Sequence, residues 1–167
     1  PFVIRLRVVL LRDTGAPLAP FNAWQIIQGL ETVGLRMKQH CSNAEKVVSF
    51  LETQKKVKNV IYPTNHQGEI KERAKKYMKG GYGSLVGMDV GTKEAGAKFI
   101  NNLKMLYHVA NIGDARSLAI HPATTTHSQL NDEELLAAGV TPGYVRLSIG
   151  IEHPDDIVAD IKQALAA

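Results

Sequence analysis

An arginine at position 146 lies in a segment whose residues alternate between apolar and polar, and its side chain is suited to binding an anionic group. Within residues 144–151 the apolar side chains occupy one face of an extended chain, and Arg146 lies on the other face. A guanidinium held on a rigid strand presents a planar fork of N–H donors that matches a carboxylate. Spacing alone leaves two more ordinary arrangements open: a solvated strand arginine, or an ion pair with Glu152.

A long irregular stretch, residues 108–130, precedes this strand and is expected to form a loop beside it. It contains a turn signal at Gly113-Asp114, a His-Pro pair and a run of threonines. Binding residues tend to lie in loops of this kind. Five polar side chains are expected to shape this loop rather than to react: Asp114, Arg116, His121, Thr126 and His127. Three of them are also candidates to hold in place the side chains that contact a substrate: Asp114, Thr126 and His127.

Several other kinds of chemistry are disfavoured. No pair of His, Cys, Asp or Glu has convincing zinc-ligand spacing, and no G-x-S-x-G nucleophile elbow is present. We therefore predict no catalytic residue and no metal site within these residues. Cys41, the single cysteine, cannot form an internal disulfide; this favours a reducing compartment, and hence the cytoplasm.

Composition also limits the partners. The net charge of +4 is spread along the chain, and aromatic residues make up only 6% of it, so we expect no nucleic-acid binding. The apolar opening segment is interrupted by Arg5 and Arg7 and is too short to cross a bilayer, so no membrane association is expected. Residues 2–11 have few apolar partners nearby in the sequence, and their pattern fits a helix or a strand equally well. A dimer contact or disorder is plausible there.

Short strands separated by helices predict an α+β fold, a small and mostly antiparallel sheet with helices packed on one face. Strands are expected in four short segments: 57–62, 84–90, 105–109 and 144–151. Helices are expected at 67–79, at 92–103, at 131–138 and from Pro154 onward.

Residues 21–54 predict one long helix ahead of the sheet. Asn22 is a suitable N-cap with Gln25 three residues later, and Phe21 and Ile26 stand at the positions of a hydrophobic staple. Apolar residues then recur every three or four positions without a proline. A helix of about thirty residues is roughly 45 Å long. We therefore favour a strut that joins two domains over a helix that simply backs a sheet.

Three segments together resemble a known family: residues 11–37, the loop at 108–130 and the strand segment YVRLSIGIEH at 144–153. They are similar to the C-terminal part of the Cys/Met-metabolism family of pyridoxal-phosphate enzymes, and within it to the O-acetylhomoserine sulfhydrylase branch. The resemblance implies a piece of a longer enzyme, the C-terminal domain of a fold-type I pyridoxal-phosphate enzyme. Its division would be 1–20 as the tail of a missing large cofactor-binding domain, 21–54 as an inter-domain helix and 55–167 as the substrate-side domain.

The resemblance also implies the residues that bind substrate. The arginine of the family's R-L-S-x-G-x-E motif holds the α-carboxylate of the amino-acid substrate, and the whole motif is present from Arg146 to Glu152. In the lyase relatives a serine at the position of Asn111 helps to hold the same carboxylate. Here an asparagine replaces it, so the contact would come either from this different side chain or from a backbone N–H. An asparagine at such a turn can also simply stabilise its own loop.

Pyridoxal-phosphate chemistry needs a lysine that forms a Schiff base. In the family this lysine follows a Ser-x-Thr pattern in the large domain, and the nearest match here, Thr92-Lys93 preceded by Val90-Gly91, lacks the serine. We expect Lys93 to be unrelated to the cofactor, and the fragment to be inactive alone. The complete enzyme would be a transferase of methionine biosynthesis, a homo-oligomer that replaces acetate by sulfide or a thiol. The alternatives are a cystathionine or methionine γ-lyase or synthase relative, and a non-catalytic assembly or ligand-binding module.

Overall fold

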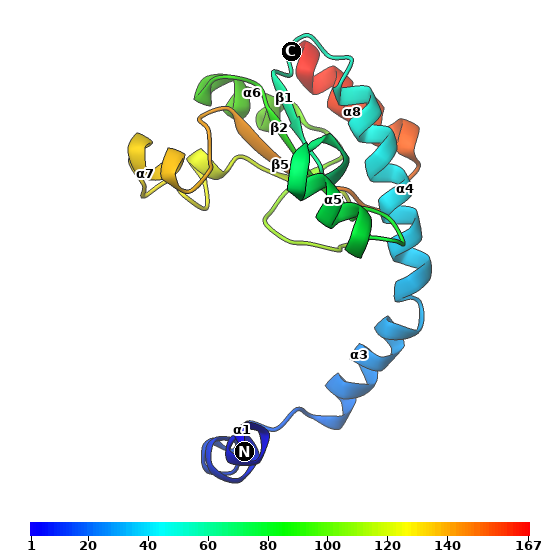
Figure 1. Ribbon diagram of the computed structural model, residues 1–167, viewed down its shortest axis with the longest axis vertical. Helices are drawn as coiled ribbons and strands as arrows, with labels where there is room; N and C mark the ends of the chain where they lie inside the picture. The colour runs from blue at the N-terminus through cyan, green and yellow to red at the C-terminus, as the bar shows by residue number, and fades with distance from the viewer. The chain divides into compact units, whose positions relative to one another are not determined.

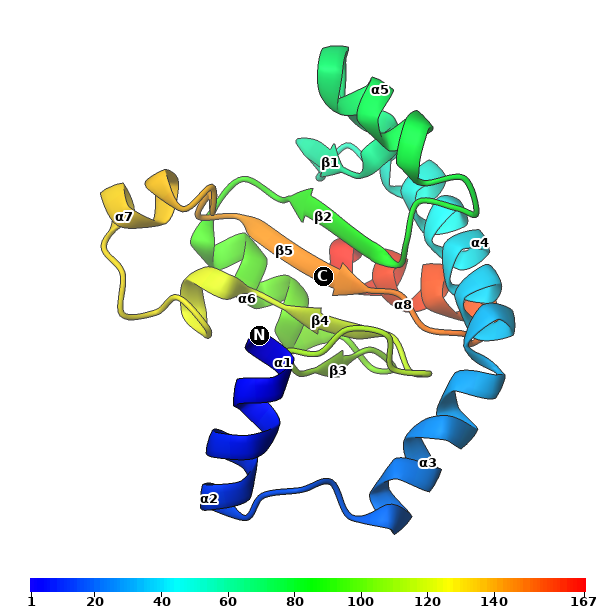
Figure 2. The ribbon, with the colours of Figure 1, turned by 60° about the horizontal axis from the view of Figure 1, so that its bottom comes forward.

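The computed structural model describes residues 1–167, which divide into two compact units, 1–34 and 35–167. The second unit is a five-stranded sheet with helices (Figures 1 and 2). Its strands are β1 (Asn59–Ile61), β2 (Leu85–Asp89), β3 (Tyr107–His108), β4 (Leu118–Ile120) and β5 (Tyr144–Ser148). Their order across the sheet is β1-β2-β5-β4-β3, in which only the β3–β4 pair is parallel. The predicted α+β fold with a mostly antiparallel sheet is confirmed.

The core of this unit lies between one face of the sheet and three helices. These are α4 (Val33–Leu51), α6 (Lys93–Asn102) and α8 (Pro154–Ala166), and their apolar residues form one cluster with the inward-facing residues of β2 and β5. Val145 and Leu147 are fully buried in it. Burial of the alternate residues fixes the register of β5, because a slip of one residue would turn Arg146 into this core.

Shorter elements complete the unit at its edges. They are η2 (Pro63–Asn65), α5 (Gly68–Tyr77), η3 (Pro122–Thr124) and α7 (Asp132–Ala137). A capping box begins α7, in which Asn131 Oδ1 accepts from Glu134 N and Glu134 Oε2 accepts from Asn131 N, both at 2.9 Å. Thr92 caps α6 through one bond, in which its Oγ1 accepts from Ala95 N at 3.1 Å. The predicted helices of this unit all exist, with ends that differ by a few residues.

One strand was missed. Residues 118–120 fall within the stretch that we expected to be irregular, yet they form β4 between β3 and β5. All three residues are buried, so the segment shows no alternation between apolar and polar. A strand covered on both faces reads as a short apolar run, which periodicity cannot identify.

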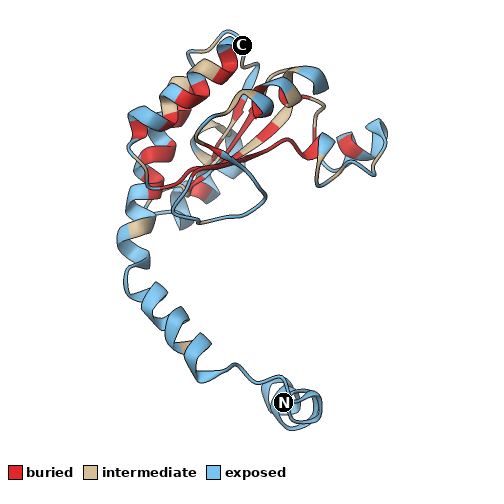
Figure 3. Ribbon diagram, turned by 180° about the vertical axis from the view of Figure 1, so that it is seen from behind, coloured by how far each residue is buried: buried red, intermediate tan, exposed pale blue.

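The first unit is helical. It contains α1 (Phe2–Arg5), a π-helical segment η1 (Leu6–Leu11), α2 (Arg12–Thr14), α3 (Pro20–Glu31) and the first residues of α4. The opening segment is therefore a helix rather than a strand, as the family resemblance implied. None of its residues is buried, as the pale blue N-terminal ribbon in Figure 3 shows. No helix of the structure is both long enough and apolar enough to cross a membrane.

The single long helix predicted at 21–54 was wrong in two respects. Thr32, with φ −107° and ψ 4°, separates α3 from α4, so two helices replace one. The first of them begins at Pro20 with Ala19 at the N-cap, not at Asn22. Proline is favoured in the first helical turn because it has no N–H to leave unpaired, and this signal prevailed over the expected capping box.

Candidate functional site

Arg146 lies on the face of β5 that points away from the helices. Its neighbours in the sheet are Gly87 on β2 and Ile120 on β4. The arginine is half-buried, and burial of the residues before and after it fixes the position of its backbone. The strand therefore presents the guanidinium from a rigid base, as the sequence predicted.

The structure brings Arg146 next to the loop that contains Asn111. Its Nη2 donates to the backbone carbonyl of Asn111 at 3.4 Å, a long hydrogen bond. The ion pairs of the structure lie elsewhere, so no carboxylate of the chain neutralises this guanidinium. Because a guanidinium has five N–H donors, most of its capacity for hydrogen bonding is unused.

A pocket of about 190 Å³ lies beside Arg146. Its lining combines residues of β1, β2 and β5 with the segment that follows β1: Ile61, Tyr62, Pro63, His66, Leu85, Val86, Gly87, Tyr144 and Arg146. A side chain at Gly87 would overlap the Tyr144 ring, since a Cβ there would lie 2.7 Å from it. Burial raises the pKa of the Tyr144 hydroxyl, and the nearby Arg146 opposes this effect. Tyr144 therefore lines the pocket with a neutral ring, and Arg146 brings a positive charge to it.

Asn111 contacts Arg146 through its backbone carbonyl and not through its side chain. Its Oδ1 accepts from the N–H of Ile112 at 2.9 Å, and the residue is exposed. The side chain thus stabilises its own turn, which was the alternative that the sequence left open. The carbonyl oxygen that it offers to Arg146 is an acceptor, so it orients the guanidinium.

The remaining candidates of the loop contact their own neighbours. Asp114 Oδ1 accepts from Arg116 N at 2.9 Å, and Thr126 Oγ1 lies 2.9 Å from His127 Nδ1. The guanidinium of Arg116 stacks over the ring of Tyr107, 4.8 Å from its centroid. These contacts shape the loop, and none of them is a contact to Arg146.

His121 is fully buried and has a partner at each ring nitrogen. Nε2 donates to Pro142 O at 2.7 Å, and Nδ1 lies 2.9 Å from Thr124 Oγ1. Burial lowers the pKa of the ring, although the bond to Pro142 opposes the shift. A Cβ at Gly96 would lie 2.5 Å from Nε2, so this ring also requires a glycine on α6. His121 is thus a neutral structural residue.

Glu152 has a role that sequence reasoning missed. We considered an ion pair with Arg146, but its carboxylate instead accepts from Ser117 N at 2.6 Å and from Ser117 Oγ at 2.8 Å. The available signal was its place at the end of the R-L-S-x-G-x-E motif. Spacing could not reveal the partner, because Ser117 lies 35 residues earlier in the chain.

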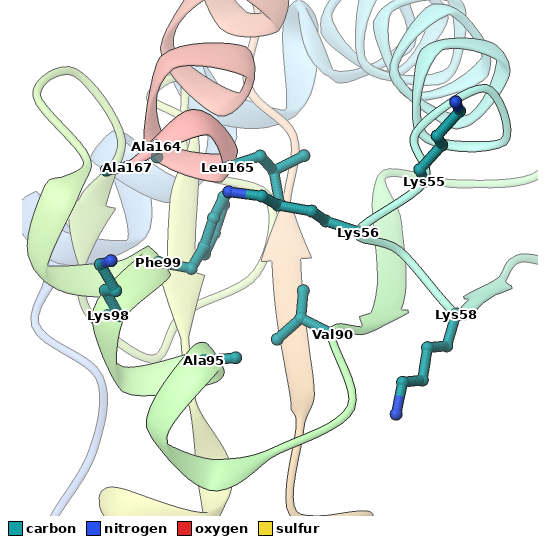
Figure 4. A pocket seen from close by; sticks show the side chains of 10 residues that line it. All are labelled: Lys55, Lys56, Lys58, Val90, Ala95, Lys98, Phe99, Ala164, Leu165 and Ala167. Carbon is teal, nitrogen blue, oxygen red and sulfur yellow. The ribbon is translucent and has the colours of Figure 1, made fainter.

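A larger pocket, of about 360 Å³, lies near α6, α8 and the segment after α4 (Figure 4). Its floor includes Phe99 and Leu165, which belong to the core cluster on the helix side of the sheet, opposite to Arg146. Four lysines surround it, and Figure 4 shows Lys56 reaching across towards Phe99. No lining side chain is acidic, so nothing here would pair with the ring nitrogen of pyridoxal phosphate. Lys93, exposed in the first turn of α6, does not line this pocket either. This pocket therefore lacks the acidic partner that the cofactor ring would need.

The sequence and the fold together match one class of enzyme. The family described as "Cys/Met metabolism PLP-dependent enzyme" matches residues 4–166. The chain belongs to this family of pyridoxal-phosphate-dependent enzymes.

Individual relatives are more specific. The chain is 50% identical to an O-acetyl-L-homoserine sulfhydrylase of Leptospira meyeri over 98% of its length, and 44% identical to a homocysteine synthase of Schizosaccharomyces pombe. A crystal structure from Campylobacter jejuni, described as that of a putative O-acetylhomoserine (thiol)-lyase with a pyridoxyl-lysine monophosphate group, aligns with a TM-score of 0.91 and 44% identity. The alignment covers 99% of this chain but 40% of that one, and the chain spans 38% of the length of each of the two sequence relatives.

Proposed function

We propose that this chain is the substrate-side part of an enzyme that replaces the acetate of O-acetylhomoserine with sulfide or a thiol. In this proposal residues 55–167 form the substrate-side domain, 21–54 connect it, and 1–20 pack on a larger cofactor-binding domain. The exposure of the apolar residues in 2–11 supports this division, because a self-contained module would bury them. The complete protein would be a cytoplasmic homo-oligomer.

The observation that carries the proposal is that the guanidinium of Arg146 has no carboxylate partner within the chain. A substrate α-carboxylate would accept two parallel N–H bonds from it, while the long contact to Asn111 O keeps the fork oriented. Residues outside this chain would hold pyridoxal phosphate, which would supply the electron sink for the loss of acetate. The task of this chain is to bind and orient the amino acid, which lowers the entropic cost of reaching a reactive geometry.

The reaction can be tested on the full-length protein with O-acetylhomoserine and sulfide. We expect one acetate and one homocysteine for each substrate consumed, and little turnover without sulfide or a thiol. A γ-lyase would instead release ammonia and a 2-oxo acid, so accumulation of these products would favour that alternative.

The location of the cofactor lysine gives a second prediction. Treating residues 1–167 with pyridoxal phosphate and borohydride should label exposed lysines sparsely and without preference. The full-length protein should carry one stoichiometric label, outside residues 1–167, when its digest is analysed by mass spectrometry. Stoichiometric labelling of one lysine within this chain, such as Lys93, would contradict the prediction.

A further inference from the structure

The turn that follows β5 is fastened to α4. Asn43 Nδ2 donates to two backbone carbonyls of the turn, Gly150 O at 3.0 Å and Glu152 O at 2.8 Å. One helical turn earlier, His40 Nδ1 donates to Ile149 O at 2.6 Å. Asn43 and His40 are both fully buried. The three bonds fix the chain a few residues beyond Arg146.

The same turn is fastened on its other side to the end of the loop. Ser117 donates to both carboxylate oxygens of Glu152, through its N–H and its hydroxyl. Its Oγ in turn accepts from Gly150 N at 2.8 Å, and Ile151 N donates to Ala115 O at 2.9 Å. We call Glu152, Ser117, Gly150 and Asn43 the Glu152 clamp.

Gly150 is required at the centre of the Glu152 clamp. A Cβ at this position would overlap Glu152 Oε2 and would lie 2.5 Å from Ala115 O and 2.6 Å from the carbonyl carbon of Arg116. Two of these three neighbours are backbone atoms, which cannot rotate away. The turn and the loop therefore touch directly, and a shift of one displaces the other.

We infer that Glu152 is a positioning residue for Arg146 and that it acts through the Glu152 clamp. Arg146 and Asn111, which contact each other, both lie a few residues from the Glu152 clamp along the chain. Arg146 is four residues before Gly150, and the loop from Asn111 reaches Ser117 within six residues. Bonds from the N–H and the hydroxyl of one residue to one carboxylate fix position and direction together. The inference rests on the proposed role of Arg146 in binding the substrate carboxylate.

A double-mutant cycle in the full-length protein tests it. Glu152→Gln replaces one acceptor oxygen with an amide that faces the donors of Ser117. We expect a KM for O-acetylhomoserine about 10-fold higher, with kcat changed less than about 2-fold, because ground-state and transition-state binding are lost together. In an Arg146→Ala background the same change should have little further effect on KM, since the residue through which Glu152 acts is gone.

A substrate without the α-carboxylate charge distinguishes a role in positioning Arg146 from a role in the stability of the fold. The preference for O-acetylhomoserine over its carboxamide, as a ratio of kcat/KM values, should fall about 10-fold in Glu152→Gln. A merely structural role would lower both values equally and leave the ratio unchanged. Ser117→Ala, which keeps the N–H bond but removes the hydroxyl, should lower the ratio to a smaller extent; it serves as the second variant if Glu152→Gln does not fold.

Glu134→Gln is the matched control, because Glu134 also accepts a backbone N–H but belongs to the exposed cap of α7. It should leave KM and the ratio unchanged. Independent, additive effects of Glu152→Gln and Arg146→Ala, or an unchanged ratio in both Glu152→Gln and Ser117→Ala, would overturn the inference. If Arg146→Ala alone leaves KM unchanged, the proposed role of Arg146 in substrate binding fails instead.

Discussion

Arg146→Ala in the full-length protein should raise the KM for O-acetylhomoserine by about 100-fold. The change removes two charge-assisted hydrogen bonds to the substrate carboxylate, which together are worth about 3 kcal/mol when the site is partly shielded from water. It should not unfold the domain, because Arg146 is half-buried and has one long hydrogen bond within the chain. Steady-state kinetics at saturating sulfide measure the effect.

Two variants make this experiment specific. Arg146→Lys keeps the charge but loses the planar fork, so we expect an intermediate increase in KM, about 10-fold. Arg73→Ala removes an exposed arginine of α5 that pairs with Glu69, and it should leave KM unchanged. A KM for Arg146→Ala equal to that of Arg73→Ala would exclude Arg146 from the site.

The strand β5, which contains Arg146, was predictable because one of its faces is buried. Apolar side chains at 145, 147 and 149 had to point into a core, and Arg146 therefore had to point away from it. The helix starts near residues 92 and 131 were also expected, and in each a cap joins residues that lie three positions apart. The approach of the loop to Arg146 was also expected, but from the family resemblance rather than from spacing.

The failures have a different physical origin. The strand β4 is buried on both faces and shows no alternation, and the partner of Glu152 is set by the fold rather than by local sequence. The break at Thr32 was hidden because the apolar stripe continues through it. Gly29 and Gly34 lie on either side and weaken the helix there, since glycine costs about 1 kcal/mol relative to alanine within a helix.

The apolar stripe that runs along α3 and α4 was misleading because its two halves differ in burial. Ile26 and Leu30 on α3 are 55% and 59% exposed, whereas Val47 and Leu51 on α4 are fully buried. The spacing of apolar residues predicts that one face of a helix is covered, but it does not predict which part of the protein covers it. In the division proposed above, residues outside this chain cover the apolar face of α3.

Asp160→Asn should lower the free energy of unfolding of residues 35–167 by about 3 kcal/mol at neutral pH. The carboxylate of Asp160, on α8, accepts the N–H groups of Lys104, Met105 and Leu106, each at 2.9 Å, and a fourth bond from Gln163 Nε2. An asparagine would turn an amide N–H₂ towards donors and leave a buried backbone N–H unpaired, which costs more than a lost surface bond. This anchor precedes β3 and hence the loop that reaches Arg146.

The loss should depend on pH in a defined direction. Burial alone would raise the pKa of Asp160, but the bonds from the three backbone N–H groups and Gln163 outweigh it and lower the pKa. The stabilisation is therefore fully present above the unfolded-state pKa of about 3.9, and it is lost as the pH falls through the lower pKa of the folded state. Urea unfolding between pH 7 and pH 3 should show a constant difference between the two proteins above about pH 4, and a difference that begins to shrink below it.

Asp156→Asn is the control on the same helix. Asp156 is exposed in the first turn of α8, where its charge interacts favourably with the helix dipole, so its removal should cost less than about 1 kcal/mol. Equal losses for the two variants at pH 7 would show that the N–H bonds of Asp160 do not hold the segment before β3. A larger loss of unfolding free energy for Asp160→Asn would show that this buried carboxylate holds the segment before β3 against α8.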